Sequence, residues 1–260
     1  MDYEPGCTML LGLSFCNHSG RCFNHGSIEF MTLGKFIVLD GNDGSGKATQ
    51  SKLLTRRLSE ESIASTIMDF PGYDRNLFGA LLGECLAGTH GDFLHMDPKI
   101  ASILYALDRF ESSKTIRDAL AMGKIVIADR FSSSNQIHQG GKIPAEYERV
   151  SFLGWLDRVE HEVLHIPRPD LIIYLRVPVE ISLKLLLEKR ATKNRLLSEG
   201  VKDTVEEDRT YLERSHETAN WLATQQKNWK VIDCANQFGM RSVEDIHNEV
   251  HKIVGSLVKG

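Results

Sequence analysis

An apolar run that leads into a glycine-rich turn constrains this chain more than any other stretch. Residues 36–40 read Phe-Ile-Val-Leu-Asp, which is typical of a buried strand, and residues 41–47 then follow the pattern G-x-x-x-x-G-K. Glycines let the backbone curl until several N–H groups point at one spot, where the start of the next helix and the lysine add positive charge. The sequence therefore predicts a strand, a phosphate-binding loop (P-loop) and a helix, in that order.

The residue after the P-loop lysine departs from the usual pattern. Ser or Thr commonly stands there and holds Mg²⁺ through its hydroxyl, whereas this chain has Ala48. Thr49 offers a hydroxyl one position later, but on a helix it is turned roughly 100° away. Either the metal then rests on phosphates, water and Asp129, or metal affinity or turnover is reduced.

The composition is that of a folded protein without a general nucleic-acid or membrane-surface role. A length of 260 residues suits one full α/β domain, although two small domains are also possible, and 42% of the residues are hydrophobic and 25% charged. The net charge is −4, and no apolar run approaches the roughly 20 residues that cross a bilayer. The five cysteines follow no zinc spacing, so we expect reduced thiols and a cytoplasmic location.

The first thirty residues are expected to stand apart from the domain. They show no helical or strand period, and acidic rather than basic residues come before the mildly apolar stretch 8–15, which makes a poor signal peptide. We predict a disordered leader or an added extension over residues 1–30. A single domain is predicted over residues 31–260, with a flap, or lid, at about 189–203.

Five short apolar runs rich in Ile and Val predict a central sheet. Their lack of clean alternation indicates burial on both faces. The predicted strands span residues 36–40, 65–68, 125–129, 171–175 and 230–233. The predicted helices span residues 49–60, 98–122, 144–165, 178–190, 205–227 and 242–258. This alternation predicts an α/β fold with a mostly parallel sheet covered on both sides, and with ligands at the carboxyl ends of the strands.

Polar clusters follow the second and third predicted strands. Residues 69–75 carry two aromatic side chains and an arginine in a Pro/Gly turn. Asp129 ends the third strand, where it either reaches a metal at the P-loop or caps the next helix. Arg130 follows it, and either offers a bidentate donor to a phosphate or forms a surface ion pair.

Two further segments carry charge that a cleft could use. Tyr105, Asp108 and Arg109 lie within one turn of a predicted helix, which makes Arg109 a reasonable second phosphate ligand. Residues 188–195 are basic and residues 203–208 acidic. These two runs form either the solvated ends of two helices or a mobile flap that closes arginines over a nucleotide.

Taken together, these motifs are similar to those of the thymidylate kinase (dTMP kinase) family, which belongs to the P-loop nucleoside monophosphate kinase superfamily. The resemblance covers about residues 34 to 258. The elements that carry it are Asp-Gly-Ser-Gly-Lys at 43–47, Phe-Pro-Gly-Tyr at 70–73, Leu-Asp-Arg at 107–109, Asp-Arg-Phe at 129–131, and Asp203 with Glu206.

The resemblance implies a fold and an activity. The implied fold is the three-layer P-loop kinase fold, with a five-stranded parallel sheet and helices on both faces, in a homodimer. The implied reaction moves the γ-phosphoryl group of ATP to dTMP with the help of Mg²⁺ and gives dTDP and ADP, without a nucleic-acid or membrane partner. Another nucleoside or nucleotide kinase of the superfamily, or a non-catalytic nucleotide-binding protein, remains the alternative.

The resemblance also assigns residues. The implied catalytic residues are Lys47, Asp43, Arg130, Arg190 and Arg195, the last two because Gly44 stands where some members carry a P-loop arginine. The implied ATP-binding residues are Gly41, Asn42, Asp43, Gly44, Ser45, Gly46, Lys47, Ala48 and Thr49. The implied substrate-binding residues are Asp43, Phe70, Pro71, Tyr73, Tyr105, Arg109, Arg130, Ser134, Asn135 and His138. The implied metal ligands are Asp43 and Asp129.

Within this set, Phe70 is implied to lie against the thymine ring and Asn135 beside the thymidine. Tyr73 and Arg109 are implied to approach the acceptor's phosphate or base. His138 stands where relatives often have a tyrosine that packs on the deoxyribose, so discrimination against ribonucleotides is an open question.

Overall fold

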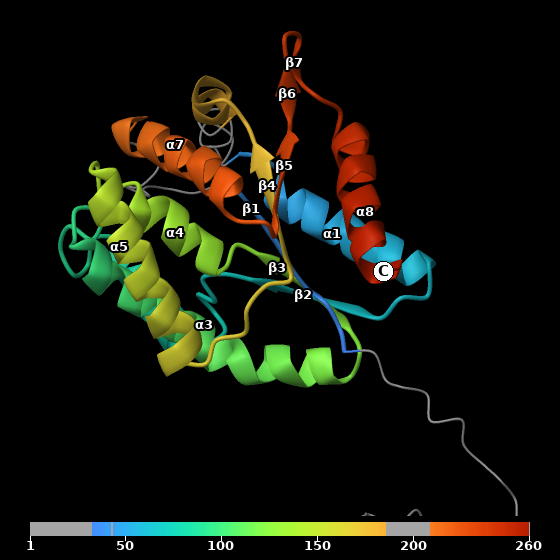
Figure 1. Cartoon of the computed structure of the whole chain (residues 1–260), viewed down its shortest axis with the longest axis horizontal. Coiled ribbons are helices and arrows are strands. Elements are labelled where there is room, and N and C mark those ends of the chain that lie inside the picture. Colours follow the sequence, from blue (N-terminus) through green and yellow to red (C-terminus); the bar gives the residue numbers. More distant parts are fainter. Residues whose placement is uncertain (1–32, 43, 186–208, 260) are drawn as a thin grey trace, which may run out of the picture. The chain divides into compact units, whose positions relative to one another are not determined.

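A five-stranded, all-parallel sheet forms the centre of the computed structural model, which describes residues 33–42, 44–185 and 209–259 (Figure 1). The strands lie in the order β2-β3-β1-β4-β5. Their bounds are β1 (Phe36–Gly41), β2 (Ser65–Asp69), β3 (Ile125–Asp129), β4 (Leu171–Arg176) and β5 (Trp229–Asp233). All five predicted strands are confirmed to within one residue at either end. The predicted parallel pairing is confirmed too, since Leu39 of β1 lies beside Asp129 of β3 and Ile173 of β4.

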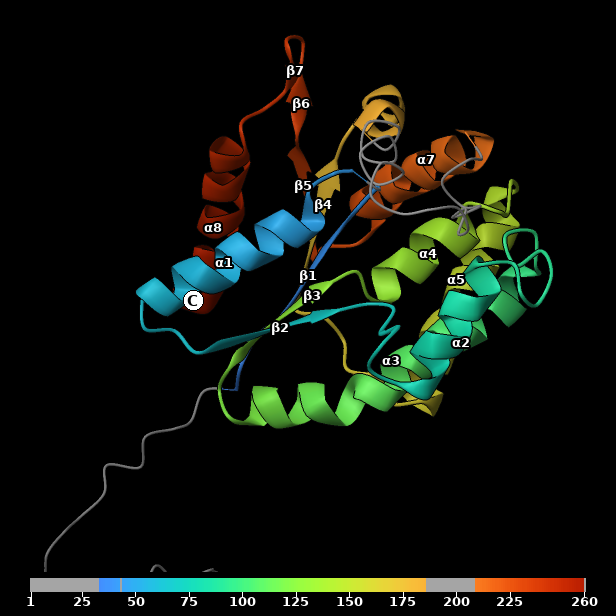
Figure 2. The ribbon, with the colours of Figure 1, turned by 180° about the vertical axis from the view of Figure 1, so that it is seen from behind.

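Helices cover both faces of the sheet (Figures 1 and 2). Helices α1 (Lys47–Glu60) and α8 (Val243–Lys259) lie on one face. The other face carries α3 (Pro98–Ala121), α4 (Ser132–Gly140), α5 (Glu146–Asp157) and α7 (Arg209–Gln225), with α2 (Leu77–Leu86) packed on α3. The predicted three-layer α/β fold is confirmed.

Side chains that alternate along β1 supply two separate cores. Phe36 and Val38 belong to the core shared with α3 and α7, whereas Ile37 and Leu39 belong to the core shared with α1 and α8. All four side chains are fully buried. A strand buried on both faces needs apolar residues at every position, which is why the sequence shows a continuous apolar run there.

Within the described residues, the predicted helix bounds hold to within two residues except in the helix predicted over 144–165. Helix α3 begins at Pro98, as predicted, because the Asp97 carboxylate accepts from the Lys99 and Ile100 N–H groups 2.9 and 3.3 Å away. The helix predicted over 144–165 is wrong in its second half, where α5 gives way to a π-helical segment, Arg158–Val163. Helices α2 and α4 were not predicted.

Several predictions fall partly or wholly outside the described residues. Residues 179–185 are helical, and the rest of the helix predicted over 178–190 is not described, nor are the flap at about 189–203 and the extension over 1–30.

Cys85 and Cys234 are buried free thiols. Among the described helices, none combines the length and the apolar character that a bilayer crossing requires.

Candidate functional site

The P-loop joins β1 to α1 and holds its lysine under the loop backbone. Gly41 can only be glycine, because an added Cβ would lie 2.6 Å from the Leu175 carbonyl oxygen. Gly46 has φ +88°, a left-handed conformation that glycine adopts without strain, directly before α1 begins. The Lys47 ammonium donates to the carbonyl oxygens of Gly41 and Asn42, each at 2.9 Å. The loop thus places a buried cation at a helix N-terminus, as the sequence predicts.

Buried polar atoms of the same loop accept and donate nothing within the described part of the chain. These are both amide atoms of Asn42 and the hydroxyl of Ser45, whose side chains are about 1% and 2% exposed. Burying unpaired polar groups is unfavourable, and such groups in a native fold need an explanation. A phosphate bound in the loop would accept from the Asn42 Nδ2 and the Ser45 hydroxyl, although it offers no donor to the Asn42 Oδ1.

A cleft of about 600 Å³ opens at the carboxyl edge of the sheet, in front of the P-loop. Its walls come from the loop after β1, the turn after β2, helix α3, the start of α4 and helix α7. The lining residues of these walls are Gly44, Gly46, Lys47, Ala48, Thr49, Asp69, Phe70, Pro71, Tyr73, Tyr105, Asp108, Arg109, Asp129, Arg130, Phe131, Ser134, Asn135, His138, Gln139, Tyr211 and Leu212. The polar clusters that the sequence places after separate strands therefore meet in one cleft.

The cleft brings together most of the residues singled out in the sequence. Every described member of the implied substrate-binding set lines it: Phe70, Pro71, Tyr73, Tyr105, Arg109, Arg130, Ser134, Asn135 and His138. Of the implied ATP-binding set, Gly44, Gly46, Lys47, Ala48 and Thr49 line it, whereas Gly41, Asn42 and Ser45 do not. Asp43, Arg190 and Arg195 lie outside the described residues.

Arg130 and His138 form one polar unit of the cleft. The two are joined at 3.0 Å between Arg130 Nη1 and His138 Nε2. A guanidinium only donates, so Nε2 accepts and the ring hydrogen lies on Nδ1, which donates to the Ser215 hydroxyl at 3.3 Å. The Tyr211 ring stacks on His138 with centroids 5.8 Å apart and an angle of 13°. Helix α7 therefore fixes His138, and His138 in turn fixes Arg130.

The backbone at Arg130 is held in a conformation that few residues adopt. Its φ is +65°, the left-handed region that disfavours a side chain, and its N–H donates to the Leu39 carbonyl at 2.9 Å. Nη1 also lies 4.0 Å from the buried carboxylate of Asp40. Asp40 is in turn held by the hydroxyls of Ser133 and Ser134 at 2.6 and 2.8 Å. Such local strain persists where the surrounding structure enforces it, which is common at functional sites.

Asp129 lies at the end of β3 and lines the cleft together with Lys47 and Arg130. Burial raises the pKa of its carboxyl, and the charges of Lys47 and Arg130 act in the opposite direction. A carboxylate at the edge of a phosphate-binding cleft has the chemistry to take part in binding a divalent cation. In the described part of the chain, no group of three or more His, Cys, Asp and Glu side chains is arranged to hold a metal by itself. Mg²⁺ does not need such a group, because it usually combines one or two carboxylates with phosphates and water.

Asp108 is a buried carboxylate whose charge is unfavourable to the fold. Its Oδ1 accepts from the Gly72 N–H at 3.0 Å, which anchors the turn that carries Phe70, while Oδ2 has no partner within the described residues. Burial raises the pKa of Asp108 above its ordinary value, although the Gly72 hydrogen bond and the Arg109 charge act to lower it. The folded state therefore binds this proton more tightly than the unfolded state, and stability falls as the pH rises through the folded-state pKa.

We expect Asp108→Asn to be more stable than the natural protein at neutral pH. The amide oxygen keeps the Gly72 contact without a buried charge, so Tm is expected to rise by about 2–4 °C, the shift that ~1 kcal/mol gives in a domain of this size. Thermal unfolding across pH checks this: the gain is expected to disappear below the ordinary carboxyl pKa of about 4. Asp118→Asn, an exposed position on the same helix, is the control. A Tm gain that stayed constant with pH would contradict the explanation.

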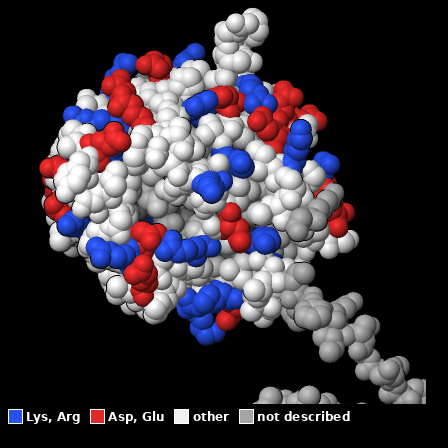
Figure 3. All heavy atoms as spheres, viewed as in Figure 1, with Lys and Arg blue, Asp and Glu red and all other residues white. Residues whose placement is uncertain are grey.

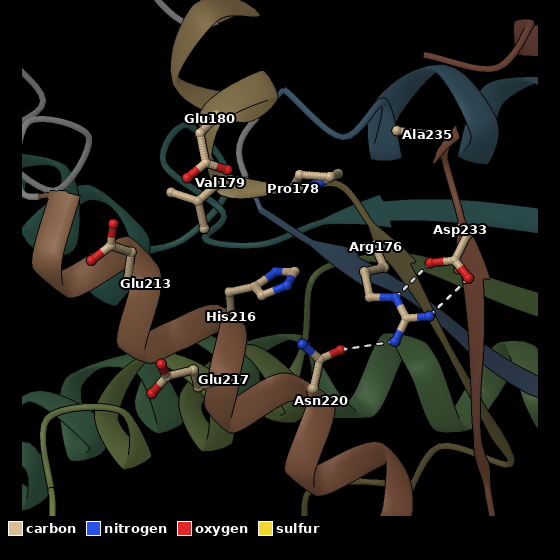
Figure 4. Close-up of a pocket in the computed structure, with 10 residues that line it drawn as sticks. All are labelled: Arg176, Pro178, Val179, Glu180, Glu213, His216, Glu217, Asn220, Asp233 and Ala235. Atoms are coloured by element: carbon tan, nitrogen blue, oxygen red, sulfur yellow. Dashed lines mark hydrogen bonds and ion pairs between the residues drawn. The ribbon is translucent and has the colours of Figure 1, made fainter. Parts of the chain in front are cut away.

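A second cavity of about 460 Å³ lies on the other side of α7 (Figure 4). Arg176 forms a fork with Asp233 at 2.5 and 2.8 Å and also donates to Asn220 at 3.2 Å. Burial lowers the pKa of His216 there, and the Arg176 charge adds to the effect. None of the described residues predicted for the site lines this cavity. The candidate site is therefore the cleft at the P-loop.

Some residues that shape the cleft escaped sequence reasoning. Tyr211 supports His138 from α7, Asp40 ties the end of β1 to α4, and Glu160 binds Arg109 from the π-helical segment. Tyr211 and Glu160 stand in helical stretches with no motif around them. Asp40 could have been found from the sequence, because it is a charged residue at the last position of an apolar strand pattern.

The arrangement can bind two phosphate groups and a flat ring. Lys47 and the N-terminus of α1 favour anions at one end of the cleft. Arg130 adds a guanidinium that can meet a phosphate at two points. Phe70 and Tyr105 offer aromatic surface on the walls of the cleft. Over the face seen in Figure 3, Lys and Arg are interspersed with Asp and Glu, and the cleft lining is mixed in the same way, with Lys47, Arg109 and Arg130 beside Asp69, Asp108 and Asp129.

Comparison with known proteins gives a consistent result. Residues 39–250 match the family model described as thymidylate kinase. A thymidylate kinase of Prochlorococcus marinus (strain AS9601) is 32% identical over 225 residues, which cover 84% of this chain and 93% of that protein. One from Thermosipho melanesiensis is 27% identical over 224 residues, or 86% of this chain and 98% of that protein.

A third relative matches a shorter region. The thymidylate kinase of Synechococcus sp. (strain JA-2-3B'a(2-13)) is 36% identical over 151 residues, which are 57% of this chain and 66% of that protein. The chain thus spans about two thirds of the length of this relative and almost the whole length of the other two. The family model covers the P-loop lysine, the turn after β2, the Asp-Arg pair after β3 and helix α7 in one continuous match. This chain belongs to the thymidylate kinase family.

Proposed function

We propose that this chain is a dTMP kinase, which transfers the γ-phosphoryl group of ATP to dTMP and gives dTDP and ADP. The observation that carries the proposal is the meeting of a P-loop and an arginine- and aromatic-lined wall in one cleft of about 600 Å³. Two phosphate-bearing ligands can then lie end to end, which a transfer between phosphates requires.

The proposed roles follow from position. Lys47 and the backbone of the loop 41–47 hold the phosphates of ATP. Arg130, oriented by His138, holds the phosphate of dTMP. Phe70, fixed edge-on against Phe131 with centroids 5.1 Å apart, offers its ring to the thymine. The roles of three further residues rest on the family resemblance alone. We propose that Asp43 contacts the acceptor or the metal, and that Arg190 and Arg195 are the arginines of the flap.

Phosphoryl transfer asks for alignment and for positive charge around the moving group. Lys47 and Arg130 both line the cleft, and the charges of both act on Asp129, so positive charge is available where the two ligands would meet. Mg²⁺, when bound, neutralises charge on the phosphates of ATP. We propose that Asp129 helps to hold it, directly or through water, which offsets the hydroxyl that Ala48 lacks.

Asp129→Asn tests this assignment. The amide carries no charge, so we expect the Mg²⁺ concentration for half-maximal ADP release to rise by about tenfold or more, with ATP and dTMP held saturating. Asp118→Asn, an exposed position away from the cleft, serves as the control for a lost carboxylate. A Mg²⁺ dependence unchanged in Asp129→Asn would remove Asp129 from the metal site.

A coupled ADP-release assay tests the function itself. We expect ADP with dTMP as acceptor, and weaker or no release with dUMP, dCMP, dGMP and UMP, in a reaction that requires Mg²⁺. Preference for another nucleotide would make the chain a different kinase of the superfamily. Retained ATP binding with no ADP from any acceptor would make it a non-catalytic nucleotide-binding protein.

We further propose that the protein is a cytoplasmic homodimer. Apolar side chains stand exposed on α2, α3 and α5, among them Leu77, Ile100 and Tyr147, and a partner subunit would cover such surface. The buried free thiols of Cys85 and Cys234 suit a reducing compartment. Sedimentation velocity tests the dimer, and a monomer at micromolar concentration would contradict it.

A further inference from the structure

We propose that Glu160 is a positioning residue that decides which base the acceptor pocket takes. It does so by fixing the hydrogen-bonding groups that Asn135 and Arg109 present to the cleft. The inference rests on the proposed function, since it concerns the acceptor nucleotide of that reaction.

Glu160 is buried behind the cleft and binds both residues at once. Its side chain is 1% exposed. Oε1 accepts from Arg109 Nη2 at 2.6 Å and from Asn135 Nδ2 at 2.9 Å, and Oε2 accepts from Arg109 Nε at 3.1 Å. Arg109 and Asn135 both line the cleft, whereas Glu160 does not. A single carboxylate therefore holds two cleft residues from outside.

The three residues come from three different elements. Arg109 lies on α3, Asn135 on α4, and Glu160 on the π-helical segment that extends α5. The Glu160 carbonyl accepts from the Ile166 N–H at 2.8 Å, which ties the chain that follows this segment back to it. Wide turns of this kind are frequent at functional sites, because they re-aim a side chain that a regular helix would point elsewhere.

The orientation of the Asn135 amide is forced by its partners. Nδ2 has two N–H groups, one directed at Glu160 Oε1 and the other at the Ser102 carbonyl, 3.1 Å away. A carboxylate and a carbonyl only accept, so the nitrogen must face them and cannot exchange places with the oxygen. What Asn135 offers to the cleft is therefore Oδ1, an acceptor.

Arg109 is oriented by the same carboxylate. Nε and Nη2 are bound to Glu160, which leaves the N–H groups of Nη1 as the donors farthest from that carboxylate. The guanidinium also lies over the Phe131 ring, 5.8 Å from its centroid, which limits its rotation. Because Arg109 and Asn135 bind the same oxygen of Glu160 and both line the cleft, we infer that one acceptor and one donor are presented to the same part of it.

This pair matches a base edge that carries a donor beside an acceptor. Thymine and uracil have such an edge, with N3–H as donor and the C4 carbonyl as acceptor. Cytosine reverses both groups, since N3 accepts and the 4-amino group donates. Glu160 therefore sets the preference for 4-oxo over 4-amino pyrimidines without contacting the base.

Glu160→Gln tests the inference, because it keeps the shape and adds a donor where only an acceptor fits. Steady-state kinetics with dTMP and dCMP, and calorimetric binding of each without ATP, are measured in the natural protein and the variant. We expect the KM and Kd for dTMP to rise about tenfold, the KM for ATP to stay unchanged, and the dTMP-to-dCMP preference to fall by about tenfold. Glu162→Gln, two residues on and exposed, is the matched control and is expected to behave like the natural protein.

A second variant guards against loss of folding, since removing one partner of a buried ion pair can be strongly destabilising. Glu160→Asp keeps the charge and the acceptors but shortens their reach, so the same changes are expected in weaker form. An unaltered base preference in a folded variant would overturn the proposal, as would equal rises in the KM values for dTMP and ATP. Absence of turnover in the natural protein would instead refute the proposed function. The calorimetric comparison of dTMP and dCMP binding would then still test the role of Glu160 in base preference.

Discussion

Replacing Lys47 with alanine is expected to lower kcat/KM for ADP release by about 10³-fold. The Lys47 ammonium is buried and lies under the P-loop, where it donates to the carbonyl oxygens of Gly41 and Asn42. On the proposed function it also meets the phosphates of ATP, where charge develops during transfer, and removing one such cation from a preorganised site has effects of this size. The main loss is expected in kcat.

The fold of Lys47→Ala is expected to remain intact. The surrounding sheet is held by two apolar cores that do not include Lys47, so Tm is expected to change little. Lys52→Ala is the matched control, because Lys52 is an exposed lysine on the same helix. A Lys47→Ala variant that keeps substantial activity would refute the role given to the P-loop lysine.

Replacing Arg130 is expected to be the next most damaging change, by about 10²–10³-fold in kcat/KM. Arg130→Lys is expected to recover little, because an ammonium cannot both reach His138 and meet a phosphate at two points. The loss is expected to appear in the KM for dTMP as well as in kcat, with the KM for ATP nearly unchanged. Steady-state kinetics with each substrate varied in turn checks this.

Two further variants separate the side chain from the backbone. Arg130→Ala keeps a Cβ at φ +65°, whereas Arg130→Gly removes it. Both are expected to lose the same activity, but the glycine variant is expected to unfold about 2–4 °C higher, since the left-handed conformation costs a residue with a side chain ~1 kcal/mol. Equal Tm values would mean that Arg130 is not strained. Normal activity in either variant would remove the guanidinium from the reaction.

The sheet was predictable because strands buried on both faces have a simple, continuous apolar pattern in the sequence. Residues 36–39, 125–128 and 171–175 are continuous apolar runs, as strands buried on both faces require. The P-loop was equally plain, since its glycines are required by φ values and close approaches that hold wherever the loop occurs. Alternation of strand and helix then fixed the parallel pairing.

Elements without a periodic apolar pattern were missed. Helix α4 reads Ser-Ser-Ser-Asn-Gln-Ile-His-Gln-Gly and buries several polar side chains, so it has no apolar stripe. Helix α2 contains two glycines in ten residues, which lowers its helical propensity. The break after Asp157 has no sequence signal either, because the polar and apolar residues continue in helical order through it.

The sequence alone determined which edge of which sheet would carry the site. Residues placed after β1, β2 and β3 must meet, because parallel strands end on one side. Tertiary structure alone decided how the side chains face the cleft. The carboxylate of Glu160 lies 51 residues from Arg109 and 25 from Asn135 in the chain, and the stacking of Tyr211 on His138 joins α7 to α4. A sequence motif shows only which residues lie close together in the chain, whereas these contacts depend on how separate helices pack against one another.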